Sequence, residues 1–406
     1  MRKQTIFPII SCLLILSMIG CKNKFDEKEF LTKILNNIEQ VKSASYFYTV
    51  TTSAPYDTMP YRTNKWYVKT FSNPADTAFG VSFGWFYPTD TAKMYRFYDG
   101  NASAYIDDDI KIISIDSFKV NRPYRPISSF FNSTKNIIQY ALTSNDSMTT
   151  AFHDFGDSLR FQLTIYSDKQ VLLFYKRPVY SNYRTLPGDE VSEHEISKYD
   201  IWVNKTTGLP YKFRAMWTNI TGWEECSDIQ INKIDIKDFF PVRYFPADYD
   251  ISVVGQGIQT PPEYNLMEKT APDWTLTDYN NESFALKDFK SKVLMIKFAG
   301  TGCPHCYASL PFLKQLITDY KDKSFELVSI ESWSDNIEGI KRFCLQNDIT
   351  YKYLIISEEV KKQYNPTGIA PLFFILDNNK VVQKVIRGYS PETTDKEIKE
   401  AIDKLL

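Results

Sequence analysis

The chain has 406 residues, of which 24% are charged and 43% are hydrophobic, and its formal net charge is −1. Because basic and acidic residues nearly cancel, no overall positive charge points to a nucleic-acid partner. The three histidines, His153, His194 and His305, stand far apart and without ligand-like spacing to cysteines, which excludes a His-rich zinc or iron centre. A length of about 150 residues per domain predicts two or three domains.

The first twenty residues have the pattern of a targeting segment. An apolar run at 6–20 follows two basic residues; it is short for a membrane-spanning helix but fits the core of a signal peptide. Gly20 stands directly before Cys21, and this arrangement resembles the lipobox of bacterial lipoproteins, in which the cysteine is acylated. The resemblance implies a signal peptide at 1–20, lipidation of Cys21 and a membrane anchor. An ordinary cleaved signal, or an apolar N-terminal anchor, is the alternative.

Residues 21–250 have the pattern of a β-rich domain that begins with a helix. Apolar residues recur at helical spacing from Phe30 to Val41, and short alternating or aromatic segments separated by turn residues follow. Asp99-Gly100 and Thr207-Gly208 are typical of hairpin turns. We therefore predict an α+β N-terminal domain with a helix and a curved antiparallel sheet. The clearest strand segments are 65–69, 104–106, 159–166 and 199–203.

One hairpin of this domain carries a more specific motif. Residues 204–210 read N-K-T-T-G-L-P between two strand segments, which resembles a hairpin of the lipoprotein-carrier-like (LolA/RseB-like) half-barrels. Such half-barrels cradle acyl chains or partner proteins, so the resemblance implies a binding role. The alternative is a β-rich spacer whose aromatic residues pack in its own core. Nothing in this half has the pattern of catalytic chemistry.

Glycines and prolines are concentrated at 251–267, which predicts a linker to a second domain at 268–406. From residue 268 onward strands alternate with helices, which is the signature of an α/β domain. The apolar run 292–298 is suited to a central strand with both faces covered. Further elements are expected as a helix after the turn at 299–302, a strand at 325–330, a helix at 337–347, a hairpin of 371–376 with 381–386, and a helix at 395–405.

The turn at 299–302 leads into Cys303-Pro304-His305-Cys306. At a helix start, free backbone N–H groups and the helix dipole stabilise the Cys303 thiolate, which can attack a partner disulfide; Cys306 then displaces the partner from the mixed disulfide. Pro304 is tolerated in the first helical turn, and His305 can add a positive charge or a donor that favours the thiolate. A zinc site would need a second Cys or His pair, which the sequence lacks.

A second segment supports redox chemistry. Ala370-Pro371 stands 65 residues after Cys306, at the start of a predicted strand. The stretch 367–371 resembles the G-[IV]-x-P loop in which thioredoxin-like proteins place a cis-proline against the C-x-x-C pair. There the residue before the proline, here Ala370, offers its backbone to the substrate chain like an added strand.

Together these segments resemble the TlpA/ResA-type membrane-tethered thiol–disulfide oxidoreductases of the thioredoxin superfamily. The resemblance covers residues 270–406, about a third of the chain. It implies a thioredoxin fold with Cys303 as nucleophile, Cys306 as resolving thiol and Pro371 as the cis-proline, and no bound cofactor. The matching segments are 271–276, 284–289, 293–306, 364–374 and 388–389.

Two departures from the family bear on the direction of the reaction. Gly302 takes the place of a tryptophan before the first cysteine, which predicts a more open site. Lys297 takes the place of the acidic proton-relay residue of thioredoxins, six residues before Cys303. A cation there stabilises thiolates if it points inward, whereas the alternative is that it extends to the sheet edge. The Pro-His dipeptide between the cysteines also resembles that of the dithiol oxidase DsbA. Reduction of client disulfides is the default activity of the family, but these features leave an oxidase or an isomerase as open alternatives.

The sequence therefore predicts a lipid-anchored oxidoreductase that exchanges disulfides with client proteins and needs a redox partner to supply or remove electrons. Lys22, after the cysteine, resembles lipoproteins sent to the outer membrane of Gram-negative bacteria, and thiol exchange favours the periplasm. A peroxidase is disfavoured, because peroxidatic sites resemble P-x-x-x-T-x-x-C. Here Thr301 stands only two residues before Cys303, and no proline occupies the corresponding place. The remaining alternative is a non-catalytic carrier or scaffold that binds apolar ligands or partners through its N-terminal domain.

Overall fold

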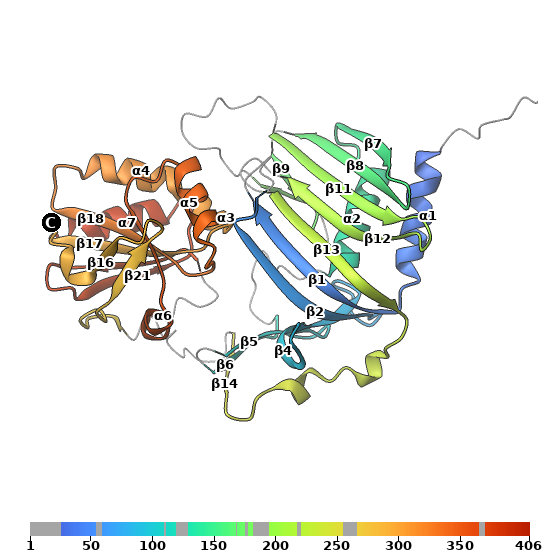
Figure 1. Ribbon diagram of the computed structural model, residues 1–406, viewed down its shortest axis with the longest axis horizontal. Coiled ribbons are helices and arrows are strands. Elements are labelled where there is room, and N and C mark those ends of the chain that lie inside the picture. Colours follow the sequence, from blue (N-terminus) through green and yellow to red (C-terminus); the bar gives the residue numbers. More distant parts are fainter. Residues whose placement is uncertain are drawn as a thin grey trace, which may run out of the picture.

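The computed structural model describes residues 26–53, 59–108, 111–118, 129–167, 169–174, 178–181, 195–216, 221–254, 266–364 and 370–406. The signal peptide expected at 1–20, Cys21 and most of the linker expected at 251–267 lie outside these ranges. Figure 1 shows a broad curved sheet, built by the N-terminal region, beside a smaller α/β body, built by the C-terminal region.

The N-terminal region is dominated by one sheet. Twelve of its described strands are joined in the order β14-β6-β5-β4-β3-β2-β1-β13-β12-β11-β8-β7, and β9 pairs with β10. All neighbours are antiparallel except β14 and β6, which are parallel. The elements are α1 (Glu27–Glu39), β1 (Ser43–Ser53), β2 (Arg62–Ser72), β3 (Val81–Tyr87), β4 (Asp90–Tyr98), β5 (Ser103–Asp107), β6 (Ile112–Asp116), α2 (Phe130–Thr143), β7 (Met148–Asp154), β8 (Ser158–Ser167), β9 (Gln170–Leu172), β10 (Val179–Ser181), β11 (Glu195–Asn204), β12 (Leu209–Met216), β13 (Thr221–Ile231), the short 3-10 helices η1 (Ile236–Asp238) and η2 (Pro241–Tyr244), and β14 (Asp250–Val253).

The predicted N-terminal helix and antiparallel sheet are confirmed. Asp26 caps α1 by accepting a hydrogen bond from the backbone N–H of Glu29 at 2.9 Å, and the apolar stripe of the helix is buried through Ile34 and Ile38. Both helices pack in one apolar cluster with the inner residues of β1, β8, β11 and β12. Gly100 and Gly208 have positive φ values of 98° and 64°, as the tight turns between β4 and β5 and between β11 and β12 require.

The C-terminal region has a thioredoxin-like fold. Its sheet has the order β16-β15-β19-β18-β17-β20-β21. The central strand β17 is parallel to β18 and antiparallel to β20. The elements are β15 (Thr275–Asp278), β16 (Ser283–Ala285), η4 (Leu286–Asp288), β17 (Val293–Ala299), α3 (Pro304–Ala308), α4 (Leu310–Asp319), β18 (Phe325–Glu331), α5 (Ile337–Gln346), β19 (Lys352–Ile355), α6 (Glu358–Tyr364), β20 (Leu372–Leu376), β21 (Val382–Arg387) and α7 (Thr394–Asp403).

Alternate residues of β17 face two apolar layers. Val293 and Met295 pack with α4 and α7, whereas Leu294, Ile296 and Phe298 pack with α6 and the first strands of the region. Every residue of β17 is buried, as expected for a central strand. The helix predicted after the C-x-x-C motif is divided into α3 and α4 at Ser309, and β15, β16, β19 and α6 were not expected from the sequence.

Among the described residues, no helix combines the length and the apolar character needed to cross a membrane.

Candidate active site

The C-x-x-C motif lies where β17 ends and α3 begins. Cys303 is the N-cap residue of α3, and its Sγ accepts a hydrogen bond from the backbone N–H of Cys306 at 3.2 Å. Both cysteines are free thiols, with exposed fractions of 3% and 2%. The two sulfur-bearing residues are therefore positioned by the short turn after a fully buried strand, in the reduced form of the pair.

The two thiols have opposite acidities. Burial by itself raises the pKa of Cys303, but hydrogen bonds from Cys306 and the nearby Lys297 ammonium overcome this effect, so that the pKa of Cys303 is lowered. Burial, together with the hydrogen bond and charge of Cys303, raises the pKa of Cys306. The first thiol is thus the one that ionises readily, and the second holds its proton.

Lys297 points inward from β17 rather than to the sheet edge. It is 1% exposed, and its Nζ donates to Ser309 Oγ at 2.9 Å and to the carbonyl oxygen of Cys306 at 3.4 Å. Burial lowers the pKa of Lys297, although the two thiols and Glu331 act in the opposite direction. The ammonium therefore lies directly beneath the first turn that carries both cysteines.

Ala370 lies next to the thiol of Cys303. The peptide bond between Ala370 and Pro371 is cis, and the thiol of Cys303 donates to the carbonyl oxygen of Ala370 at 3.3 Å. The sequence-predicted partners Cys303 and Ala370-Pro371 are thus brought together by β17 and β20, which are neighbours in the sheet. His305 is exposed at the surface of α3.

Glu331 is a site residue that the sequence did not single out. It ends β18, is 0% exposed, and accepts hydrogen bonds from the backbone N–H groups of Thr301, Trp333 and Ser334 at 2.9, 2.9 and 3.0 Å. The hydroxyl of Tyr353 donates to it at 2.9 Å. Burial raises the pKa of Glu331 in spite of these bonds. The carboxyl group fixes the loop that precedes Cys303.

The more open site expected from Gly302 is not what the structure shows. Gly302 has a φ of +83°, and a Cβ on it would lie 2.8 Å from Cγ2 of Thr52, a residue of β1. The indole of Trp333 likewise covers Gly300, where a Cβ would meet it at 2.2 Å. The space beside Gly302, where a tryptophan side chain would begin, is therefore occupied by Thr52 of the N-terminal region.

Cys344 has a packing role in the core. Cys344 is 1% exposed in the apolar cluster that also holds both redox cysteines, and burial raises its pKa above the ordinary range of a thiol. Within the described ranges, no group of three or more His, Cys, Asp or Glu residues has an arrangement that could hold a metal ion.

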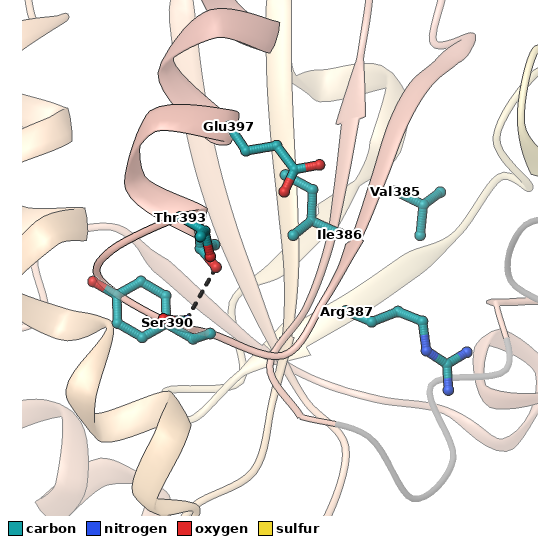
Figure 2. Close-up of a pocket in the computed structure, with 8 residues that line it drawn as sticks. Val385, Ile386, Arg387, Ser390, Thr393 and Glu397 are labelled. Atoms are coloured by element: carbon teal, nitrogen blue, oxygen red, sulfur yellow. Dashed lines mark hydrogen bonds between the residues drawn. The ribbon is translucent and has the colours of Figure 1, made fainter. Parts of the chain in front are cut away.

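A separate hollow of about 380 Å³ lies between β21 and α7. Figure 2 shows Arg387 on one side of it and Thr393 and Glu397 on the other. None of its lining residues belongs to the cysteine site described above, so we assign it no part in thiol chemistry.

Comparisons with known proteins agree with this geometry. A family model described as Redoxin matches residues 267–402. The thiol-disulfide oxidoreductase ResA of Bacillus thuringiensis subsp. konkukian is 30% identical over 151 residues, which are 37% of this chain and 84% of that protein. ResA of Geobacillus kaustophilus is 28% identical over 120 residues, 29% of this chain and 68% of that protein.

Among solved structures, the thioredoxin domain of a thiol-disulfide oxidoreductase from Bacteroides vulgatus aligns with 20% identity and a TM-score of 0.29, over 33% of this chain and 96% of that domain. The family relation itself rests on the ResA sequences. These favour an oxidoreductase over a non-catalytic carrier. The chain belongs to the TlpA/ResA-type thiol-disulfide oxidoreductases of the thioredoxin superfamily.

Proposed function

We propose that the protein is a lipid-anchored, extracytoplasmic thiol-disulfide oxidoreductase that reduces disulfides of client proteins through Cys303 and Cys306. The observation that carries the proposal is the contrast between the two thiols. Cys303, beside the Ala370 carbonyl, has a lowered pKa, whereas Cys306 is buried and has a raised one. In such a pair the first thiol ionises readily and can attack a client disulfide, whereas the second stays protonated until the mixed disulfide has formed.

In the proposed reaction the Cys303 thiolate attacks one sulfur of a client disulfide. The client S–S bond breaks, a bond from Cys303 to the client forms, and the client's other sulfur leaves as a thiolate that takes up a proton. Cys306 then loses its proton and attacks Cys303, which releases the second client thiol and closes the Cys303–Cys306 disulfide. Two electrons pass to the client, so a redox partner must reduce the pair again before the next turnover.

We assign supporting roles to five further residues. Lys297 stabilises the thiolates by its charge, and Pro304 and His305 tune the first turn of the helix. Ala370, held by the cis bond to Pro371, offers its backbone to the client chain. The contacts of Lys297 with Ser309 and with the Cys306 carbonyl support the first of these roles.

The remaining parts of the proposal come from the sequence. They are a signal peptide at 1–20, an acylated Cys21, a β-rich domain at 21–250 with a lipoprotein-carrier-like character, a linker at 251–267, and the thioredoxin-like domain at 268–406. They place the protein on a membrane facing the periplasm, with the outer membrane of a Gram-negative bacterium favoured. Mass spectrometry of the mature N-terminus would test the acylation of Cys21.

The reduction potential of the pair tests the direction of electron flow. The protein is equilibrated with a thiol buffer and the fraction of oxidised Cys303–Cys306 is measured. A value near that of thioredoxin, about −270 mV, supports a reductase, whereas one near that of DsbA, about −120 mV, would make it an oxidant. In addition, Cys306→Ser should accumulate a mixed disulfide with client proteins, and the matched Cys303→Ser variant should not. Absence of any reversible couple would refute the proposal.

A further inference from the structure

The N-terminal region touches the thioredoxin-like domain through the adjoining ends of β1 and β2. We call residues 52–53 and 59–62 the docking end; Figure 1 shows these strand ends next to α3 and α5. The carbonyl oxygen of Pro60 accepts hydrogen bonds from Asn336 Nδ2 at 3.1 Å and from the guanidinium group of Arg342 at 3.0 Å. The Tyr61 carbonyl accepts from Ser334 Oγ at 3.2 Å. The contact is thus made by specific polar groups.

Tyr61 anchors the docking end in the apolar cluster that contains both redox cysteines. It is 2% exposed, and its ring meets Phe343 edge to face at a centroid distance of 5.6 Å. Its hydroxyl donates to Gln346. A Cβ on Gly339 would lie 2.8 Å from the Tyr61 carbonyl oxygen, so the backbone of the docking end approaches α5 as closely as a glycine allows. A buried aromatic with a satisfied hydroxyl is typical of the residue that dominates a contact.

The docking end also reaches the loop before the nucleophile. Thr52 occupies the space beside Gly302, and the guanidinium group of Arg62 lies 5.0 Å from the centroid of the Trp333 ring. Arg62 is partly buried, and this burial lowers the pKa of its guanidinium group. The surface on this side of Cys303 is therefore already covered by another part of the same chain.

We propose that the docking end determines client size: it admits small disulfides and disulfides in extended segments, and it hinders folded proteins. The inference rests on the proposed function. A client sulfur must reach Cys303, which is only 3% exposed. A folded client brings a broad surface with its disulfide, and that surface collides with the docking end. A small or extended client brings little surface beyond the disulfide that must meet the Cys303 sulfur and the Ala370 backbone, so it collides less with the docking end.

The test compares four reduced full-length proteins: wild type, Tyr61→Ala, Gln346→Leu and Phe47→Ala. Phe47 is the matched control, because it is an aromatic residue of the same strand that is 38% exposed and packs on Tyr67. The value of kcat/KM, taken as the second-order rate constant for a single oxidation of the reduced Cys303–Cys306 pair, is measured with hydroxyethyl disulfide, with a short disulfide-bonded peptide and with a folded protein that has one surface disulfide. A second variant, Gln346→Leu, removes the acceptor of the Tyr61 hydroxyl from the other side of the contact.

We expect Tyr61→Ala to raise kcat/KM for the folded protein by about tenfold, because truncation of a buried contact aromatic weakens docking by at least that factor. Gln346→Leu should raise it by about threefold, as the loss of one hydrogen bond implies. The kcat/KM values for the small disulfide and the peptide should change by less than about twofold in every variant, because on this proposal neither substrate collides with the docking end. Phe47→Ala should match the wild type throughout.

Two results would overturn the inference while the proposed function stands. The first is an unchanged or lower rate with the folded protein, since a lower rate would make the docking end a contact for clients. The second is an equal rise with all three disulfides, which would mean that the docking end acts on the reactivity of Cys303 and not on selection. If the wild type reduced none of the disulfides, the proposed function would fail and the inference with it.

Discussion

Replacing Lys297 by methionine tests the electrostatic basis of the reactive thiol. The ammonium is buried between Ser309 Oγ and the carbonyl of Cys306, and no carboxylate lies within ion-pair distance of it among the described residues. Methionine has a similar length and no charge, so Lys297→Met removes the cation while it preserves the packing of β17 against α4. Because a buried charge is replaced by an apolar group, we expect the melting temperature to stay the same or rise.

The size of the effect follows from Coulomb's law. At an effective dielectric constant of about 20, two unit charges about 4 Å apart interact by about 4 kcal/mol, and the energy is inversely proportional to their separation. Burial lowers the pKa of Lys297 itself, and a lysine that is partly neutral acts more weakly. We expect the pKa of Cys303 to rise in Lys297→Met, because the Lys297 charge is one of the influences that lower it.

The assay is the rate of alkylation by iodoacetamide as a function of pH. The rate follows the thiolate fraction of Cys303 and increases as the pH rises through its pKa, so the curve of Lys297→Met should lie at higher pH than that of the wild type. Near pH 7 this means a rate about tenfold lower or more. Lys292→Met is the control, because Lys292 is an exposed lysine just before β17. Coincident curves for Lys297→Met and the wild type would refute the electrostatic role.

Three further variants probe the loops and the N-terminal sheet. Glu331→Gln should lower the free energy of unfolding by about 3 kcal/mol in denaturant titrations, because an amide cannot accept from all of its buried donors; a loss below about 1 kcal/mol would contradict this. Gly302→Ala should cost about 1 to 2 kcal/mol by the same measurement, because of its φ of +83° and the nearby Thr52. Burial raises the pKa of Glu224 from 4.5 to about 7. Because the pKa of this carboxyl is higher in the folded state, the free energy of unfolding should fall as the pH rises between those two values. Glu224→Gln should make this fall less steep, and identical pH profiles of stability for the variant and the wild type would contradict the reasoning.

Much of the thioredoxin-like fold follows from local pattern. The apolar run that becomes β17 and the positions of β18, α5, β20 and β21 are visible because periodicity and turn residues are local signals. The short strands β15, β16 and β19 are not, since three or four residues carry too little periodicity, and their pairing depends on the rest of the sheet. The helix is interrupted between α3 and α4 at Ser309, shortly before a proline. Neither residue by itself indicates a helix boundary in the sequence.

The site shows the same division. Cys303 and Cys306 are recognisable because their spacing is a motif, whereas Glu331 is one acidic residue at the end of an apolar strand. Its register opposite Ala299 in the neighbouring strand brings it beneath the redox loop, and only the pairing of β17 with β18 reveals this. The contact of Thr52 with Gly302 joins segments 250 positions apart, and no pattern within either segment announces it.

The parallel pairing of β14 with β6 has a practical consequence for dividing the chain. After β13 the chain runs through Phe239, Tyr244 and Phe245, which pack against the apolar residues of β2, β3 and β4, and it returns to cover the β6 edge through Asp250–Val253. A fragment that stops near residue 235 would lack both this packing and strand β14. The backbone N–H and C=O groups on the free edge of β6 would then be available to pair with another molecule. Fragments of the N-terminal region should therefore extend at least through Val253 if the β6 edge is to stay paired within the fragment.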